Sequence, residues 1–98
     1  MPTYETVFVI PSVLSEEEKN RSLEDVEKLI DKSGGKINKK EDMGERDLAY
    51  RIASYDRGFY HLIEFEGPAD MIKTLKKHFR LNDKYIRNII INNETSKI

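Results

Sequence analysis

Six basic residues lie between positions 73 and 87, where Asp83 is the only acid, so this stretch carries a charge of +5. Ammonium and guanidinium groups bind phosphate oxygens, and a guanidinium can do so through two parallel hydrogen bonds. Residues 16–31 have the opposite character, with seven acids, three bases and a charge of −4, while the whole chain carries −1. This separation is typical of a domain with one side facing a polyanion, although a charge run can also be only the solvated face of a helix.

Other reactive side chains are scarce. There is no cysteine, which excludes disulfides, zinc–thiolate centres, iron–sulfur clusters and thiol nucleophiles. The two histidines, His61 and His78, cannot form a metal site without several supporting carboxylates, and no serine–histidine–aspartate arrangement is available. We expect His61 to be a hydrogen-bonded core residue and His78 to face solvent. The sequence therefore predicts no enzyme activity, no cofactor, no metal and no small-molecule substrate.

Length and composition indicate one small cytosolic binding module. The 98 residues are 36% charged and 38% hydrophobic, which is polar enough for a solvated surface and apolar enough for a core. No apolar run approaches the roughly 18 residues of a membrane span, and the N-terminus lacks a signal pattern, so we expect no membrane association. We predict a single domain over residues 1–92 and a short flexible tail over residues 93–98.

Two helices have clear boundary signals. Ser15 and Glu18 form a capping box, in which the hydroxyl and the carboxylate each satisfy a backbone amide. Gly34 and Gly35 are expected to end this first helix, because glycine readily adopts positive φ. Pro68 is expected in the first turn of the second helix. The apolar stripe of that helix is Met71, Ile72, Leu75 and Phe79.

Four segments read as strands: residues 4–10, 36–52, 59–66 and 85–92. In the second of them the apolar residues fall at odd positions before Gly44 and at even positions after it. Because strand side chains alternate between faces, this change requires an extra residue, and we predict a β-bulge at Gly44. The resulting order is β-α-β-β-α-β, an α+β ferredoxin-like fold with a four-stranded antiparallel sheet and two helices on one face.

The second sheet face is left uncovered by the helices. Strand parity places Phe8, Phe59 and His61 under the helices, and it places Tyr85 outward together with Arg87. A contiguous apolar surface approaches the limit for a soluble monomer, so we predict a protein partner on this face, although scattered exposed aliphatic residues are also ordinary. The predicted partner face consists of Val7, Val9, Tyr60, Leu62, Ile89 and Ile91, flanked by Arg51 and Arg87.

An alternative function is a module like an RNA-recognition motif that binds single-stranded RNA. Residues 57–59 and 7–9 resemble the two motifs with which such domains stack bases on their open sheet face. The positions that follow residue 59 do not carry the expected residues. This alternative also requires Phe8 and Phe59 to point outward, against the predicted parity.

Residues 44–53, Gly-Glu-Arg-Asp-Leu-Ala-Tyr-Arg-Ile-Ala, resemble the signature of the bacterial small-subunit ribosomal protein six family. That signature is Gly, any residue, a basic residue, a polar residue, Leu-Ala-Tyr, any residue and Ile. The resemblance extends over residues 4–92, with Tyr4 at its start and residues 58–60 in the family's order. One departure is Arg51, which stands where the family usually has proline.

The resemblance implies a structural component of the 30S subunit of the cytoplasmic ribosome. Family members bind the central domain of 16S rRNA together with ribosomal protein eighteen, with which they form a heterodimer. The open face is then interpreted as the protein-partner surface, with basic residues at its margin facing phosphates. We expect arginines to contribute more than Lys73 or Lys76, because a guanidinium binds phosphate in a bidentate manner. The predicted RNA-binding residues are Arg46, Arg80, Lys84 and Arg87.

Overall fold

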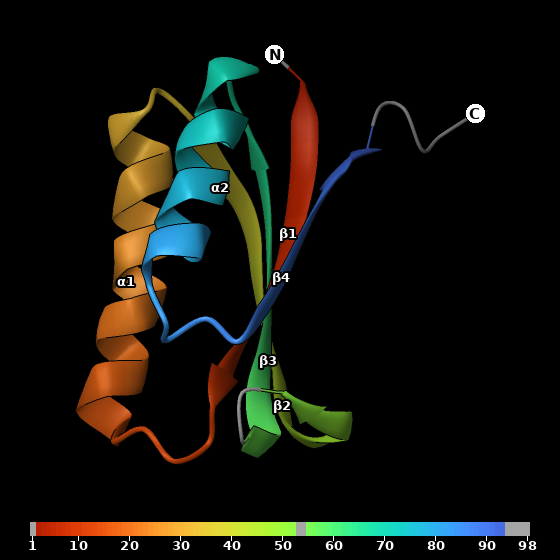
Figure 1. Ribbon diagram of the computed structural model, residues 1–98. Helices are drawn as coiled ribbons and strands as arrows, with labels where there is room; N and C mark the ends of the chain where they lie inside the picture. Colours follow the sequence, from red (N-terminus) through yellow and green to blue (C-terminus); the bar gives the residue numbers. More distant parts are fainter. Residues whose placement is uncertain (1, 53–54, 94–98) are drawn as a thin grey trace.

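The computed structural model describes residues 2–52 and 55–93, without the side chains of residues 49–52. Its elements are β1 (Thr3–Pro11), α1 (Glu16–Lys32), β2 (Lys36–Ile52), β3 (Tyr55–Glu66), α2 (Asp70–Leu81) and β4 (Arg87–Asn92). The strands form one antiparallel sheet in the order β2-β3-β1-β4, and both helices cover the same face (Figure 1). The predicted ferredoxin-like fold is confirmed. The predicted tail falls almost entirely outside the described residues.

The boundaries of α1 follow the predicted signals. The Ser15 hydroxyl accepts a hydrogen bond from the backbone N–H of Glu18 at 3.2 Å, and the Glu18 carboxylate accepts one from the Ser15 N–H at 3.5 Å. Gly34 has a φ of +87° just beyond the helix. The expected place of Pro68 is wrong by a few residues, because α2 begins at Asp70. Pro68 precedes that helix and accepts a hydrogen bond from the N–H of Met71 through its carbonyl.

The hydrophobic core lies between the sheet and the two helices. Phe8 of β1 is fully buried, and its ring centroid lies 5.6 Å from that of Phe79 in α2. A buried ring under the helices cannot stack a base on the open face, so the RNA-recognition-motif alternative is wrong. Phe59 also lies on the helix side, half-buried, with the Lys19 ammonium 3.9 Å from its ring centroid. The core cluster contains Tyr4, Phe8, Ile10, Val26, Ile30, Ile63, Phe65, Met71, Leu75, Phe79 and Tyr85.

The outward position predicted for Tyr85 is wrong. β4 begins only at Arg87, so the alternation of a strand does not govern Tyr85, which turns beneath the helices and is 7% exposed. Its hydroxyl donates to the Ser22 carbonyl of α1 at 2.6 Å and lies 3.1 Å from Nε2 of His78 in α2. Burial raises the pKa of Tyr85. The solvent-facing position predicted for His78 is also wrong, because its contact with the Tyr85 hydroxyl leaves the His78 side chain half-buried.

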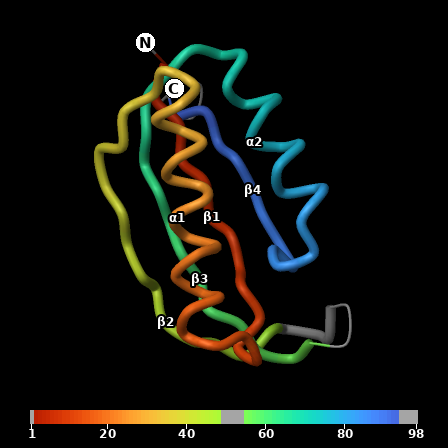
Figure 2. Tube along the Cα trace, turned by 90° about the vertical axis from the view of Figure 1, so that its left-hand side faces the viewer, coloured from red at the N-terminus to blue at the C-terminus, as the bar shows by residue number. Residues whose placement is uncertain are grey.

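The bulge predicted at Gly44 is confirmed. The pairing of β2 with β3 shifts between Asp42 and Gly44, where Gly44 has a φ of +85° and donates its N–H to the Asp42 carboxylate at 2.8 Å. A further shift between Ile37 and Lys39 was not predicted, because the polar residues 38–42 separate Ile37 from the next apolar residue, Met43, and carry no parity signal. Figure 2 looks onto the helix-covered face, where β2 follows one margin of the sheet and α2 lies toward the other, nearest β4.

His61 is inward-facing as predicted, but the structure shows no hydrogen bond to its Nε2 from the described residues. The residue is 4% exposed. Burial lowers the pKa of His61, while the nearby Asp42 carboxylate acts in the opposite direction. The ring lines a cavity of about 270 Å³ whose other walls include Leu23, Glu27 and Lys40.

Candidate interface on the open sheet face

The register of the strands places the six predicted partner residues on the uncovered face. Val7 of β1 lies opposite Leu62 of β3 and, on its other side, opposite Ile89 of β4. Directly opposed residues of neighbouring strands project to the same side of a sheet. The next row on this face contains Tyr60, Val9 and Arg87, and Ile91 follows at the other end. These side chains therefore form a band that crosses β3, β1 and β4.

The six side chains differ in how much surface they offer. Ile89 is 54% exposed and Ile91 is 36% exposed, whereas Val9 is only 2% exposed. The expected availability of Val9 is therefore wrong, although its register position is as predicted. The space over Gly58 explains this burial, because a Cβ on that glycine would lie 2.4 Å from Cγ1 of Val9. Val9 thus fills the space that the missing side chain of Gly58 leaves, and it is a buried member of the band that offers almost no surface to a partner.

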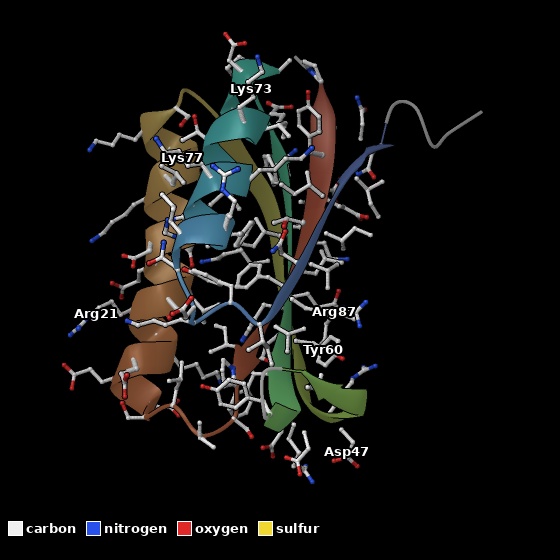
Figure 3. The ribbon with its side chains drawn as sticks, in the orientation of Figure 1. Arg21, Asp47, Tyr60, Lys73, Lys77 and Arg87 are labelled. Atoms are coloured by element: carbon white, nitrogen blue, oxygen red, sulfur yellow. The ribbon has the colours of Figure 1, made fainter. Side chains whose placement is uncertain are left out.

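One end of the band is basic and aromatic. The guanidinium carbon of Arg46, on β2, lies 5.9 Å from the ring centroid of Tyr60, and Arg46 Nε donates to the Met43 carbonyl at 3.3 Å. Arg87 projects from β4 on the same side as Tyr60, away from the helices (Figure 3). A groove of about 320 Å³ lies between Tyr60 and Arg87. Its described lining residues are Val7, Val9, Tyr60, Arg87, Asn88 and Ile89.

The opposite end of the band is acidic. Glu5 of β1 lies directly opposite Glu64 of β3, and Glu64 lies opposite Lys39 of β2. Like charges in directly opposed positions destabilise a strand pair, so the Glu5–Glu64 pair is a local cost to the sheet. The pairing of Glu5 with Glu64 could not be predicted from the single strands, because it depends on the register of β1 on β3. The open face therefore changes from acidic near Glu5 to basic near Arg46 and Arg87.

The other predicted RNA-binding residues lie away from this face. Arg80 is exposed in the last turn of α2 and lines a second cavity, of about 390 Å³, with Tyr55 and Asn82 among its walls. Lys84 stands in the loop between α2 and β4. Lys73 and Lys77 project from α2, on the helix side of the sheet (Figure 3). The side chain of Arg51, predicted to flank the band, is outside the described part of the chain.

Metal and membrane sites receive no support from the described residues. Within residues 2–52 and 55–93 no group of three or more histidine, cysteine, aspartate or glutamate side chains is placed to hold a metal ion. None of the helices in that part of the chain is long and apolar enough to cross a membrane.

The sequence pattern of the family described as "Ribosomal protein S6" matches residues 3–92. The chain belongs to the ribosomal protein S6 family. It is 38% identical to the small ribosomal subunit protein bS6 of Campylobacter jejuni over 97 residues, covering 99% of this chain and 78% of that one. The bS6 protein of Nitratiruptor is 37% identical, with 99% of this chain and 76% of the relative covered.

A solved relative has the same architecture. The crystal structure of 30S ribosomal protein S6 from Thermotoga maritima superposes with a TM-score of 0.90 at 32% identity, covering 98% of this chain and 92% of the other. The ribosomal protein S6 family consists of structural ribosomal proteins, so this chain is a component of the small subunit of the cytoplasmic ribosome and not an enzyme. Membership confirms the family resemblance carried by residues 44–53.

Proposed function

We propose that this protein binds the central domain of 16S rRNA as a heterodimer with ribosomal protein eighteen. The observation that carries the proposal is the apolar band of the open face, which ends beside two arginines. A net charge of −1 gives the chain little long-range attraction to a polyanion. Joint binding with a partner that supplies further positive charge removes this difficulty, because affinity for nucleic acid grows with the number of phosphates neutralised.

The partner protein covers the exposed part of the band. Ile89 and Ile91 leave a third or more of their surfaces in water, and Val7 and Leu62 are half-buried beside them. Apolar surface that the fold leaves uncovered gains free energy when a partner removes it from water. Val9 contributes indirectly, because it is already buried and only holds its neighbours in place.

Arginines bind the RNA from the margins of the fold. Arg46 and Arg87 lie at the basic end of the open face, where phosphates can approach without passing the acidic end. Arg80 and Lys84 add contacts from the end of α2 and the loop that follows it. Lys73 and Lys77 extend from the helix layer and chiefly keep α2 soluble.

Binding to a central-domain fragment of 16S rRNA, with and without ribosomal protein eighteen, tests this function. We expect tight binding only when both proteins are present. The variants Arg46→Ala, Arg80→Ala and Arg87→Ala should each reduce the slope of log affinity against log salt by about one, which is the signature of one lost phosphate contact. Lys73→Ala is the matched control from the helix layer and should leave the slope unchanged. Equal losses from this control would show that α2, and not the sheet margin, faces the RNA.

A further inference from the structure

We propose that Tyr60 is a stacking platform for an unpaired nucleobase, with Arg46 and Arg87 binding the phosphates on either side of that nucleotide. This inference rests on the proposed RNA-binding function and assigns the basic end of the open face to RNA, leaving the rest of the band to the protein partner.

The surroundings of Tyr60 suit a flat ligand. Gly44 lies opposite Tyr60 in the register of β2 on β3, so no side chain from that position covers the ring. Arg46 approaches instead, with its guanidinium carbon 5.9 Å from the ring centroid. On the other side Val9 is buried opposite Tyr60, which gives the half-buried ring a firm base. The ring is thus held by the sheet and still accessible from the groove of about 320 Å³ beside it.

The charges around the groove favour a nucleic acid over a protein side chain. None of its described lining residues is acidic, and Arg87 lies directly across Val9 from Tyr60. Two guanidinium groups thus bracket one aromatic ring, an arrangement that matches the alternation of phosphate and base along a single strand. The acidic pair Glu5 and Glu64 lies at the far end of the face, so RNA is confined to the Tyr60 end.

Stacking here differs from that of an RNA-recognition motif. Those domains would use the positions of Phe8 and Phe59, which lie on the helix side of this sheet. Tyr60 belongs to the same strand as Phe59 but projects to the other face. Base stacking is tolerant of sequence because every base has a π-face, so Tyr60 adds affinity without specifying a particular base.

Substitutions at Tyr60 test the inference in the assembled heterodimer. Tyr60→Leu keeps an apolar side chain but removes the ring, whereas Tyr60→Phe keeps the ring and removes the hydroxyl. With ribosomal protein eighteen at saturating concentration, we expect Tyr60→Leu to weaken binding to the central-domain fragment by about 5- to 100-fold without changing the salt slope. Tyr60→Phe should bind like the original protein. Val13→Ala is the control, because it removes exposed apolar surface from the loop between β1 and α1, away from the open face, and it should retain RNA affinity.

Each other outcome has a definite meaning. If the original heterodimer does not bind the fragment, the proposed function itself fails. If it binds and Tyr60→Leu binds equally well, the function stands and the stacking inference is overturned. The inference is likewise overturned if Tyr60→Leu weakens association with ribosomal protein eighteen instead, or if Tyr60→Phe loses as much RNA affinity as Tyr60→Leu. Thermal unfolding of each variant, monitored by circular dichroism, establishes that it is folded.

Discussion

Replacing Ile89 with glutamate separates a role in partner binding from a role in folding. Ile89 is 54% exposed in β4, so about half of its surface remains for a partner to bury. Complete burial of an isoleucine side chain is worth about 1.5–3 kcal/mol, so truncation to alanine should cost the complex about 1 kcal/mol, or about fivefold in affinity. Glutamate adds the cost of an unpaired charge in an apolar interface, and we expect Ile89→Glu to weaken partner binding by at least about 100-fold.

Folding should hardly respond to the same change. In the free protein the new carboxylate lies in water on an edge strand, and surface substitutions of this kind usually alter stability by about 0.5 kcal/mol or less. Val9→Glu is the matched control, since Val9 occupies the same face but is 2% exposed. It should unfold the domain or destabilise it severely, because it places a charge in a packed gap.

Isothermal titration calorimetry with ribosomal protein eighteen measures the affinity, and urea unfolding of the free variants measures stability. Unchanged partner affinity for Ile89→Glu would refute the assignment of the open face as the protein interface. Unfolding by Ile89→Glu alone would show that Ile89 belongs to the core and that the two faces have been interchanged.

Three further predictions concern buried polar groups and the bulge. Tyr85→Phe removes the hydrogen bond to the Ser22 carbonyl and should lower the free energy of unfolding by about 1 kcal/mol, seen as a fall of about 4–8 °C in Tm; no change would show that this bond contributes nothing. Burial lowers the pKa of His61 below 6.5, so the stability it contributes is fully present above about pH 6.5 and is lost as the pH falls toward the lowered pKa. In urea titrations, the free energy of unfolding of His61→Leu should therefore fall less between pH 7 and 5 than that of the original protein. It should also be higher by about 1 kcal/mol, because the substitution removes the Nε2 atom that has no described partner. A steeper fall between pH 7 and 5 would contradict this. Gly44→Ala meets no atom within 4 Å but must keep a φ of +85°, so denaturant unfolding should show a cost of about 1–2 kcal/mol, and a neutral result would mean that the bulge relaxes.

Local signals accounted for most of the fold. The capping box of Ser15 acts between neighbours in the chain, and the parity change at Gly44 follows from the alternation of a single strand. Such signals need no knowledge of distant contacts, which is why the element order could be predicted. The place of Pro68 was less secure, since it depends on how the chain leaves β3.

Predictions that depended on distant neighbours were less successful. Tyr85 was assigned to the open face by strand parity, but a hydrogen bond to Ser22, 63 positions away in the chain, draws it into the core. Val9 was assigned the correct face but the wrong exposure, because the space that receives it belongs to Gly58 on another strand. His61 was predicted to be hydrogen-bonded, and only the packed structure shows that its Nε2 has no partner among the described residues.

The sequence by itself determined the elements, their order, the family signature in residues 44–53 and the positions of the charges along the chain. Only the tertiary structure decided which of those charges share a surface. The pairing of β1 with β3 sets Glu5 against Glu64, and the pairing of β2 with β3 brings Arg46 to Tyr60. Arg80 stays on the other layer although it is close to Arg87 in sequence. Periodicity gives the face of each strand separately, whereas a surface is made by the register between strands, and that register depends on packing across the whole domain.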